Sequence, residues 1–131
     1  MNVEGVAGGV VLLRGIEKRR ARNPEGLVKL GRQILERVPV NTLVIHPTSY
    51  ALAISKGDTA IVEGPFTLKP LITTGAGDHF NAGFCLGKLL GLDNAMSLLA
   101  GVSTSGFYVR TAKSPSIADV VGLLRKWPAG T

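Results

Sequence analysis

The sequence predicts an α/β domain, and three observations support this. A continuous apolar run, Leu43 to Ile45, follows a segment with helical spacing, which is typical of a strand buried in a parallel sheet. A hairpin pattern comes next, and the rest of the chain has the spacing of helices. Because only this one strand looks centrally buried, we expect part of a layered α/β/α structure rather than a complete doubly wound sheet.

The first helix should begin at Asn23, where Asn can cap the helix and Pro24 fits the first helical position. Leucines, isoleucine and valine recur at helical spacing until Pro39 ends the pattern. Residues 1–22 are poorly determined, and Val10 to Leu13 fits either a short strand or a helix turn. We therefore divide the chain into a basic segment, 1–22, and a domain part, 23–131.

The middle of the chain predicts strands. Thr42 to His46 should form the buried strand. Ala51 to Ser55 and Thr59 to Glu63 should form a hairpin, because Gly57 stands in the turn between them. A short extended piece, Leu68 to Thr73, should follow.

The last part of the chain predicts three helices. Their expected starts are Gly75, Asp93 and Ser116, and their expected ends are Leu90, Val109 and the residue before Pro128. Glycine at position 91 is a natural helix stop, and Ser116 with Asp119 resembles a capping box.

The net charge of +6 concentrates near the start of the chain. A solvated surface is the simplest interpretation of Lys18 to Arg22. Nucleic-acid binding is a weak alternative, because no aromatic side chain lies between these bases to stack on a nucleotide.

Composition also narrows the cellular context. The lone Cys85 excludes an intrachain disulfide and fits a small core residue in a reducing cytoplasm. No apolar run approaches the ~20 residues of a membrane span, so we expect no membrane association.

The segment from Thr73 to Phe80 carries the candidate chemistry. Gly75, Ala76 and Gly77 can turn their N–H groups into one concavity at the start of a helix, where the helix dipole favours an anion. Asp78, in the first helical turn, could then take a proton from a hydroxyl that attacks a bound phosphate. On shape alone, a tight turn whose Asp merely favours the dipole is an equally good interpretation.

The run Thr73-Thr74-Gly75-Ala76-Gly77-Asp78-His79-Phe80-Asn81-Ala82-Gly83-Phe84 resembles the second signature of the ribokinase-like (PfkB-type) carbohydrate kinases. The similarity continues through Ala100 to Ser103 and Ala112 to Ser116. It implies a partial ribokinase-like fold, the C-terminal nucleotide-binding half of a three-layer α/β/α domain. It also implies ATP-dependent phosphoryl transfer to a hydroxyl of a sugar or nucleoside.

The resemblance implies a role for each matching residue. Asp78 would be the catalytic base, and Gly75, Ala76 and Gly77 would form the anion hole. The nucleotide-binding residues would be Thr48, Thr74, Ala100 and Ser103. ATP would bring Mg²⁺, held mostly by phosphates and water, so no protein metal ligand is expected.

The chain departs from the family pattern at three positions. His46-Pro47-Thr48 replaces the more usual Thr-x-Gly, and Gly101 stands where many members carry Asn. Ile72 replaces an Asp that helps to hold a monovalent cation, so Ile72 argues against a potassium-type site.

Members of this family are typically more than twice as long, and their first half binds the sugar. We therefore expect this chain to be a fragment that is inactive in isolation and whose sugar or nucleoside is bound mainly by residues elsewhere. The alternative is a non-catalytic nucleotide-binding or interaction module derived from a kinase half. A homodimer is possible. We expect His79 to be packed or on the helix surface rather than to take part in chemistry. We expect Arg110 to be a surface charge at a helix end.

Overall fold

The computed structural model describes residues 2–6, 10–14 and 23–128. Its strands are β1 (Asn2–Val6), β2 (Val10–Arg14), β3 (Thr42–Ile45), β4 (Tyr50–Ser55) and β5 (Asp58–Glu63), which form one sheet in the order β1-β2-β3-β4-β5. The β2–β3 pair is parallel, and the other neighbours are antiparallel. Thus the segment at Val10 is a strand, one of its two predicted forms. The basic run at Lys18 lies outside the described residues.

The described helices are α2 (Pro24–Leu35), α3 (Ala76–Leu89), α4 (Asn94–Thr111) and α5 (Ile117–Arg125). Their starts confirm the predicted caps. The Asn23 side chain accepts a hydrogen bond from the Gly26 N–H at 3.1 Å, and Asp93 accepts one from Met96 at 2.8 Å. Ser116 and Asp119 form the reciprocal bonds of a capping box. None of these helices is long and apolar enough to cross a bilayer.

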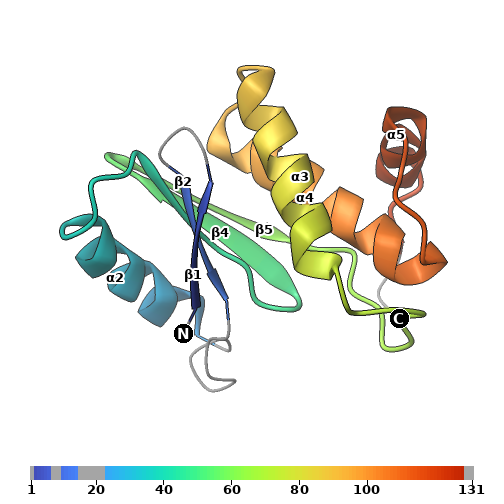
Figure 1. Ribbon diagram of the computed structural model, residues 1–131, viewed down its shortest axis with the longest axis horizontal. Helices are drawn as coiled ribbons and strands as arrows, with labels where there is room; N and C mark the ends of the chain where they lie inside the picture. The colour runs from blue at the N-terminus through green and yellow to red at the C-terminus, as the bar shows by residue number, and fades with distance from the viewer. Residues whose placement is uncertain (1, 7–9, 15–22, 129–131) are drawn as a thin grey trace.

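The sheet lies between two helical layers, with α2 on one face and α3 with α4 on the other (Figure 1). Side chains on a strand alternate between faces. On β3, Leu43 and Ile45 pack under α2, whereas Val44 packs under Phe80 and Phe84 of α3. The structure therefore confirms the layered α/β/α prediction.

Strand β4 corrects the prediction of a single centrally buried strand. Its residues from Tyr50 to Ile54 are all buried, as those of β3 are. The alternation of Ala51 and Ala53 with Leu52 and Ile54 hides this burial in the sequence. The alanines are small because α3 and α4 pack closely over that face.

The hairpin is as predicted, and Gly57 has the positive φ of 77° that the turn between β4 and β5 requires. The extended piece predicted at Leu68 to Thr73 forms no strand. This segment has a different partner: the Leu71 N–H donates to the Val109 carbonyl near the end of α4 at 2.7 Å. It therefore links the sheet to α3 across the end of α4.

Helices α3 and α4 approach closely because glycines line their contact. A methyl group added at Gly83 would lie 2.6 Å from the Ala100 carbonyl oxygen, and one at Gly87 would lie 2.8 Å from the Ser97 Cα. Neither distance is possible without moving a backbone. The glycines therefore set the separation of the two helices, and with it the place where α3 begins.

Candidate active site

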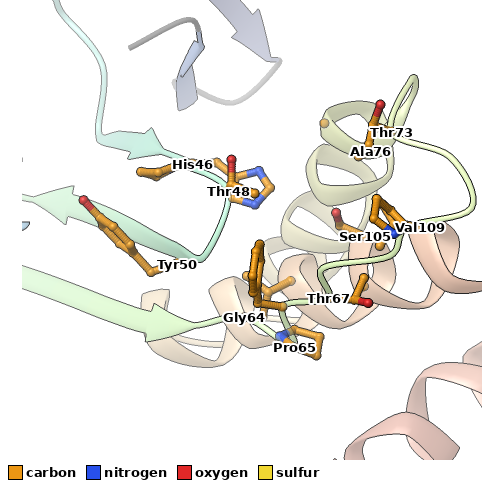
Figure 2. Close-up of a pocket in the computed structure, with 16 residues that line it drawn as sticks. His46, Thr48, Tyr50, Gly64, Pro65, Thr67, Thr73, Ala76, Ser105 and Val109 are labelled. Atoms are coloured by element: carbon orange, nitrogen blue, oxygen red, sulfur yellow. The ribbon is translucent and has the colours of Figure 1, made fainter. Parts of the chain in front are cut away.

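A cavity of about 370 Å³ lies between the loop after β3, the loop after β5, the start of α3 and the second half of α4 (Figure 2). Its volume falls within the range of small-molecule sites. The lining residues are His46, Pro47, Thr48, Tyr50, Gly64, Pro65, Phe66, Thr67, Pro70, Thr73, Ala76, Gly77, Val102, Ser105, Gly106 and Val109. The lining is mainly apolar, with a few hydroxyl groups.

The loop after β3 is fixed by an aromatic contact. The ring of His46 stacks on the ring of Phe80, with 3.9 Å between centroids. Phe80 is fully buried, so it gives His46 a rigid support. Thr48, which the resemblance implies in nucleotide binding, is exposed two residues further on and lines the cavity.

The start of α3 forms another wall. Gly75 caps the helix with a φ of 91°, in the left-handed region that favours glycine. Ala76 and Gly77 line the cavity, and Asp78 is exposed beside them in the first helical turn. The Ala76 N–H donates to the Thr73 carbonyl at 3.1 Å. An anion at this turn would therefore share that donor with Thr73.

Helix α4 lines the cavity with one face. Its lining residues are Val102, Ser105, Gly106 and Val109, which recur at helical spacing. Ala100 and Ser103 do not line the cavity. The Ala100 carbonyl accepts a hydrogen bond from the Thr104 hydroxyl at 2.7 Å. Ser103 is fully buried, and within the described chain its hydroxyl has no hydrogen-bond partner.

The sequence does not indicate which face of α4 lines the cavity, because small residues occur on several sides of the helix. Gly101 faces α3, where an added methyl group would meet Phe80 at 2.7 Å. Gly106 faces the loop after β5, where a methyl group would meet Pro65 at 2.3 Å. The helical spacing of Val102, Ser105 and Val109 indicates one face for the cavity. The small residues on two other faces of the helix indicate those faces equally well.

Arg110 corrects the prediction of a simple surface charge. Its guanidinium donates to the carbonyls of Pro65, Gly106 and Phe66, the last two at 3.2 and 3.0 Å. Partial burial lowers the pKa of the Arg110 guanidinium from its usual value. The residue thus binds the loop at Pro65 and Phe66, a wall of the cavity, to the last turns of α4.

Replacing Arg110 with methionine should lower the free energy of unfolding by about 2 kcal/mol, because hydrogen bonds from a charged donor contribute roughly 1.5–3 kcal/mol. Urea denaturation would measure the change. Arg125→Met is the matched control, since Arg125 is exposed on α5, and it should cost less than ~0.5 kcal/mol. Equal losses in the two variants would show that the Arg110 contacts do not hold the loop.

Comparison with known proteins gives a consistent result. Residues 14–127 match the model of the family described as prokaryotic ketohexokinase. A ketohexokinase of Haloferax volcanii is 37% identical over 85 residues, which are 65% of this chain and 23% of that protein.

Solved structures with similar folds include the nucleoside kinase of Methanocaldococcus jannaschii, an archaeal member of the ribokinase family. Its TM-score is 0.64 at 25% identity, over 83% of this chain and 38% of that one. A protein from Escherichia coli described as a ribokinase II, in complex with ATP and Mg²⁺, has a TM-score of 0.63 at 15% identity, over 78% and 33%.

These comparisons confirm the ribokinase-like fold, and the chain spans about a quarter to two fifths of the length of these relatives. The matched region runs from the end of β2 to beyond α5 and includes the glycine turn at Gly75 and the cavity beside it. The chain therefore belongs to the prokaryotic ketohexokinase family, within the PfkB-type carbohydrate kinases.

Proposed function

We propose that the protein transfers a phosphoryl group from ATP to a hydroxyl of a sugar, with a ketohexose as the first candidate acceptor. One observation carries the proposal: Ala76 and Gly77, at the N-terminus of α3, line the cavity, and the carboxylate of Asp78 lies in the same helical turn. A helix N-terminus is a favourable place for a phosphate. A base beside it is what activation of an attacking hydroxyl requires.

The division of labour follows from charge. The amides of Gly75, Ala76 and Gly77 would stabilise the negative charge of the transferring group, and the Ala76 N–H would be shared between that group and the Thr73 carbonyl. The carboxylate of Asp78 repels phosphate oxygens but can accept a proton from the incoming alcohol. The chemistry needs little more than this, because phosphoryl transfer depends on positioning and electrostatics.

The rest of the nucleotide would occupy the cavity. Val102, Val109 and Phe66 offer apolar surface to a base, and Thr48 offers a hydroxyl. Thr74 is exposed at the edge of the glycine turn and would contact phosphate from there. Ala100 and Ser103, like Thr74, do not line the cavity, and their part in binding the nucleotide is what the resemblance implies.

Mg²⁺ fits this site as a companion of ATP. Among the described residues, no group of three His, Cys, Asp or Glu side chains could hold a metal ion, so phosphates and water would supply most of its ligands. The ion would supply charge neutralisation to the phosphates. We include no monovalent cation, since Ile72 offers no oxygen ligand.

This chain matches only part of each relative. The acceptor would be bound by a region equivalent to the unmatched part of the relatives, on the same polypeptide or on another. The relatives differ in activity, one being a ketohexokinase and the other a nucleoside kinase. The cavity and the glycine turn would hold the phosphoryl donor and the base, which such enzymes would share. Donor binding is therefore the step that this chain can be asked to perform.

Calorimetry with ATP and Mg²⁺, followed by an assay of phosphoryl transfer to fructose, glucose, ribose and adenosine, tests the proposal. We expect this chain alone to bind ATP but to transfer little or no phosphoryl group, and we expect transfer to fructose when the sugar-binding part is present as well. ATP binding without transfer to any acceptor, even with the sugar-binding part present, would favour the alternative, a non-catalytic nucleotide-binding module. Absence of ATP binding would overturn both.

A further inference from the structure

Three side chains from different elements meet at the glycine turn of α3. The His79 ring lies 2.7 Å from the Gly75 carbonyl oxygen through Nδ1 and 2.8 Å from the Ser114 hydroxyl through Nε2. The same ring stacks on Tyr108 of α4, with 3.7 Å between centroids and 11° between planes. The Tyr108 hydroxyl donates to the Thr74 carbonyl at 2.8 Å. We call this group, His79 with Tyr108 and Ser114, the His–Tyr clamp.

The contacts fix which His79 nitrogen carries the proton. A carbonyl oxygen can only accept, so Nδ1–H donates to Gly75. In the neutral ring, Nε2 then accepts from the Ser114 hydroxyl, whose proton can rotate to suit it. Every polar atom of the clamp has a partner, so the ring has one preferred orientation. These contacts make His79 a packed residue, one of the two positions predicted for it.

The clamp side chains bind carbonyl oxygens, and because each peptide is planar, each of these bonds also orients an amide N–H. The Thr74 carbonyl and the Gly75 N–H belong to one planar trans peptide and point in opposite directions. The Gly75 carbonyl and the Ala76 N–H are related in the same way. A hydrogen bond that holds either carbonyl therefore aims the amide on the other side of the same plane.

The glycine turn has a particular need for such support. Gly75 has a φ of 91°, and glycine has more accessible conformations than any other residue. Tyr108 also limits the turn sterically, because a methyl group at Gly75 would lie 3.0 Å from its hydroxyl oxygen. The turn is thus held from one side by the hydrogen bonds of the clamp and by contact with Tyr108.

We propose that Tyr108 and His79 are positioning residues. Tyr108 holds the Thr74 carbonyl and so aims the Gly75 amide at the phosphoryl group. His79 adds a side-chain bond to the Gly75 carbonyl, which the His79 N–H also binds at 3.1 Å, and so steadies the Ala76 amide that an anion would share with Thr73. The inference rests on the proposed function. It assigns no contact with substrate to either side chain. Loss of the Tyr108 hydrogen bond would leave the Gly75 amide present but free to turn away, so transition-state stabilisation would fall more than ATP affinity.

Two substitutions separate the hydrogen bonds from the packing. Tyr108→Phe removes one hydroxyl and keeps the stacked ring, and His79→Phe keeps a ring but removes both hydrogen bonds of the side chain. Thr111→Val is the matched control, because it removes a hydroxyl that binds the Phe107 carbonyl at the same end of α4, at 2.9 Å. The measurements are kcat, the KM for ATP, and hydrogen exchange of the Gly75 and Ala76 amides by NMR.

We expect Tyr108→Phe to lower kcat roughly tenfold, with less than a threefold change in the KM for ATP, since loss of a complete oxyanion donor costs ~10²–10³. Exchange of the Gly75 amide should accelerate about fivefold, as expected for the loss of one hydrogen bond. His79→Phe should accelerate exchange of the Ala76 amide by a smaller factor, because the His79 N–H still holds the Gly75 carbonyl and the Ala76 N–H still donates to Thr73. Thr111→Val should change neither quantity.

Unchanged kcat and unchanged amide exchange in both clamp variants would overturn the inference, as would equal losses in Thr111→Val. Failure of the proposed function is distinguishable from this result. If the unsubstituted protein transfers no phosphoryl group, NMR of the backbone amides tests the inference without an activity assay. A shift of the Gly75 resonance with inorganic pyrophosphate that is lost in Tyr108→Phe supports the clamp, and no difference between the two proteins refutes it.

Discussion

Asp78→Asn should lower kcat for phosphoryl transfer by ~10²–10⁴-fold, the usual contribution of a general base. Asparagine has nearly the size of aspartate but cannot accept the proton of the attacking hydroxyl. The KM for ATP should change little, because the carboxylate repels phosphate and contributes no attraction to it. A coupled assay with saturating fructose and varied ATP would separate the two constants, since a loss confined to kcat identifies an interaction made only in the transition state.

The control for this variant is Glu63→Gln, which removes a carboxylate from an exposed position on β5. It should leave kcat within twofold of the unsubstituted protein. Thermal melting of Asp78→Asn should be checked, because an acidic residue in the first helical turn also stabilises the helix by ~0.3–1 kcal/mol. Equal rates for Asp78→Asn and the unsubstituted protein would exclude Asp78 as the base.

Gly83→Ala should destabilise the fold by about 2–3 kcal/mol, although alanine is the better helix former by ~1 kcal/mol. The added methyl group would lie 2.5 Å from the Thr104 hydroxyl oxygen and 2.6 Å from the Ala100 carbonyl oxygen. The hydroxyl can rotate away, but the carbonyl belongs to the backbone of α4. Relief of the contact therefore requires that α3 and α4 separate, which loosens the core at Phe80 and Phe84.

Gly122→Ala provides the opposite control, because a methyl group at Gly122 would meet no atom within 4 Å. Gly122 also lies in a helix, α5, so the change should stabilise the protein by ~0.5–1 kcal/mol. Urea denaturation of both variants gives the comparison. If Gly83→Ala were as stable as Gly122→Ala, the close approach of α3 and α4 would not depend on glycine.

The parts of the fold that could be predicted are set by residues that lie close together in the sequence. The Asn23 and Asp93 caps, the Ser116 capping box and the turn at Gly57 are local choices, and each is where the sequence predicts it. The resemblance in the Gly75 segment supplied the family and the fold. The features that sequence reasoning missed all depend on contacts between distant segments.

Arg110 illustrates such a contact, because its partners at Pro65 and Phe66 are more than forty residues away. The pairing of His79 with Tyr108 and Ser114 is equally nonlocal. The face of α4 that lines the cavity could not be chosen from composition, since Gly101 and Gly106 lie on different sides of it. The nucleotide-binding roles of Ala100 and Ser103 stay predictions from the resemblance.

The Phe80 ring has a consequence for how this family varies. One surface of Phe80 supports His46, and a neighbouring part of the ring occupies the space left by the missing side chain of Gly101. Positions 46 and 101 are two of the places where the chain departs from the usual family pattern. Because both meet the same ring, the two positions should covary: a relative with a larger residue at 101 must displace Phe80, and a histidine at 46 then loses the ring on which it stacks.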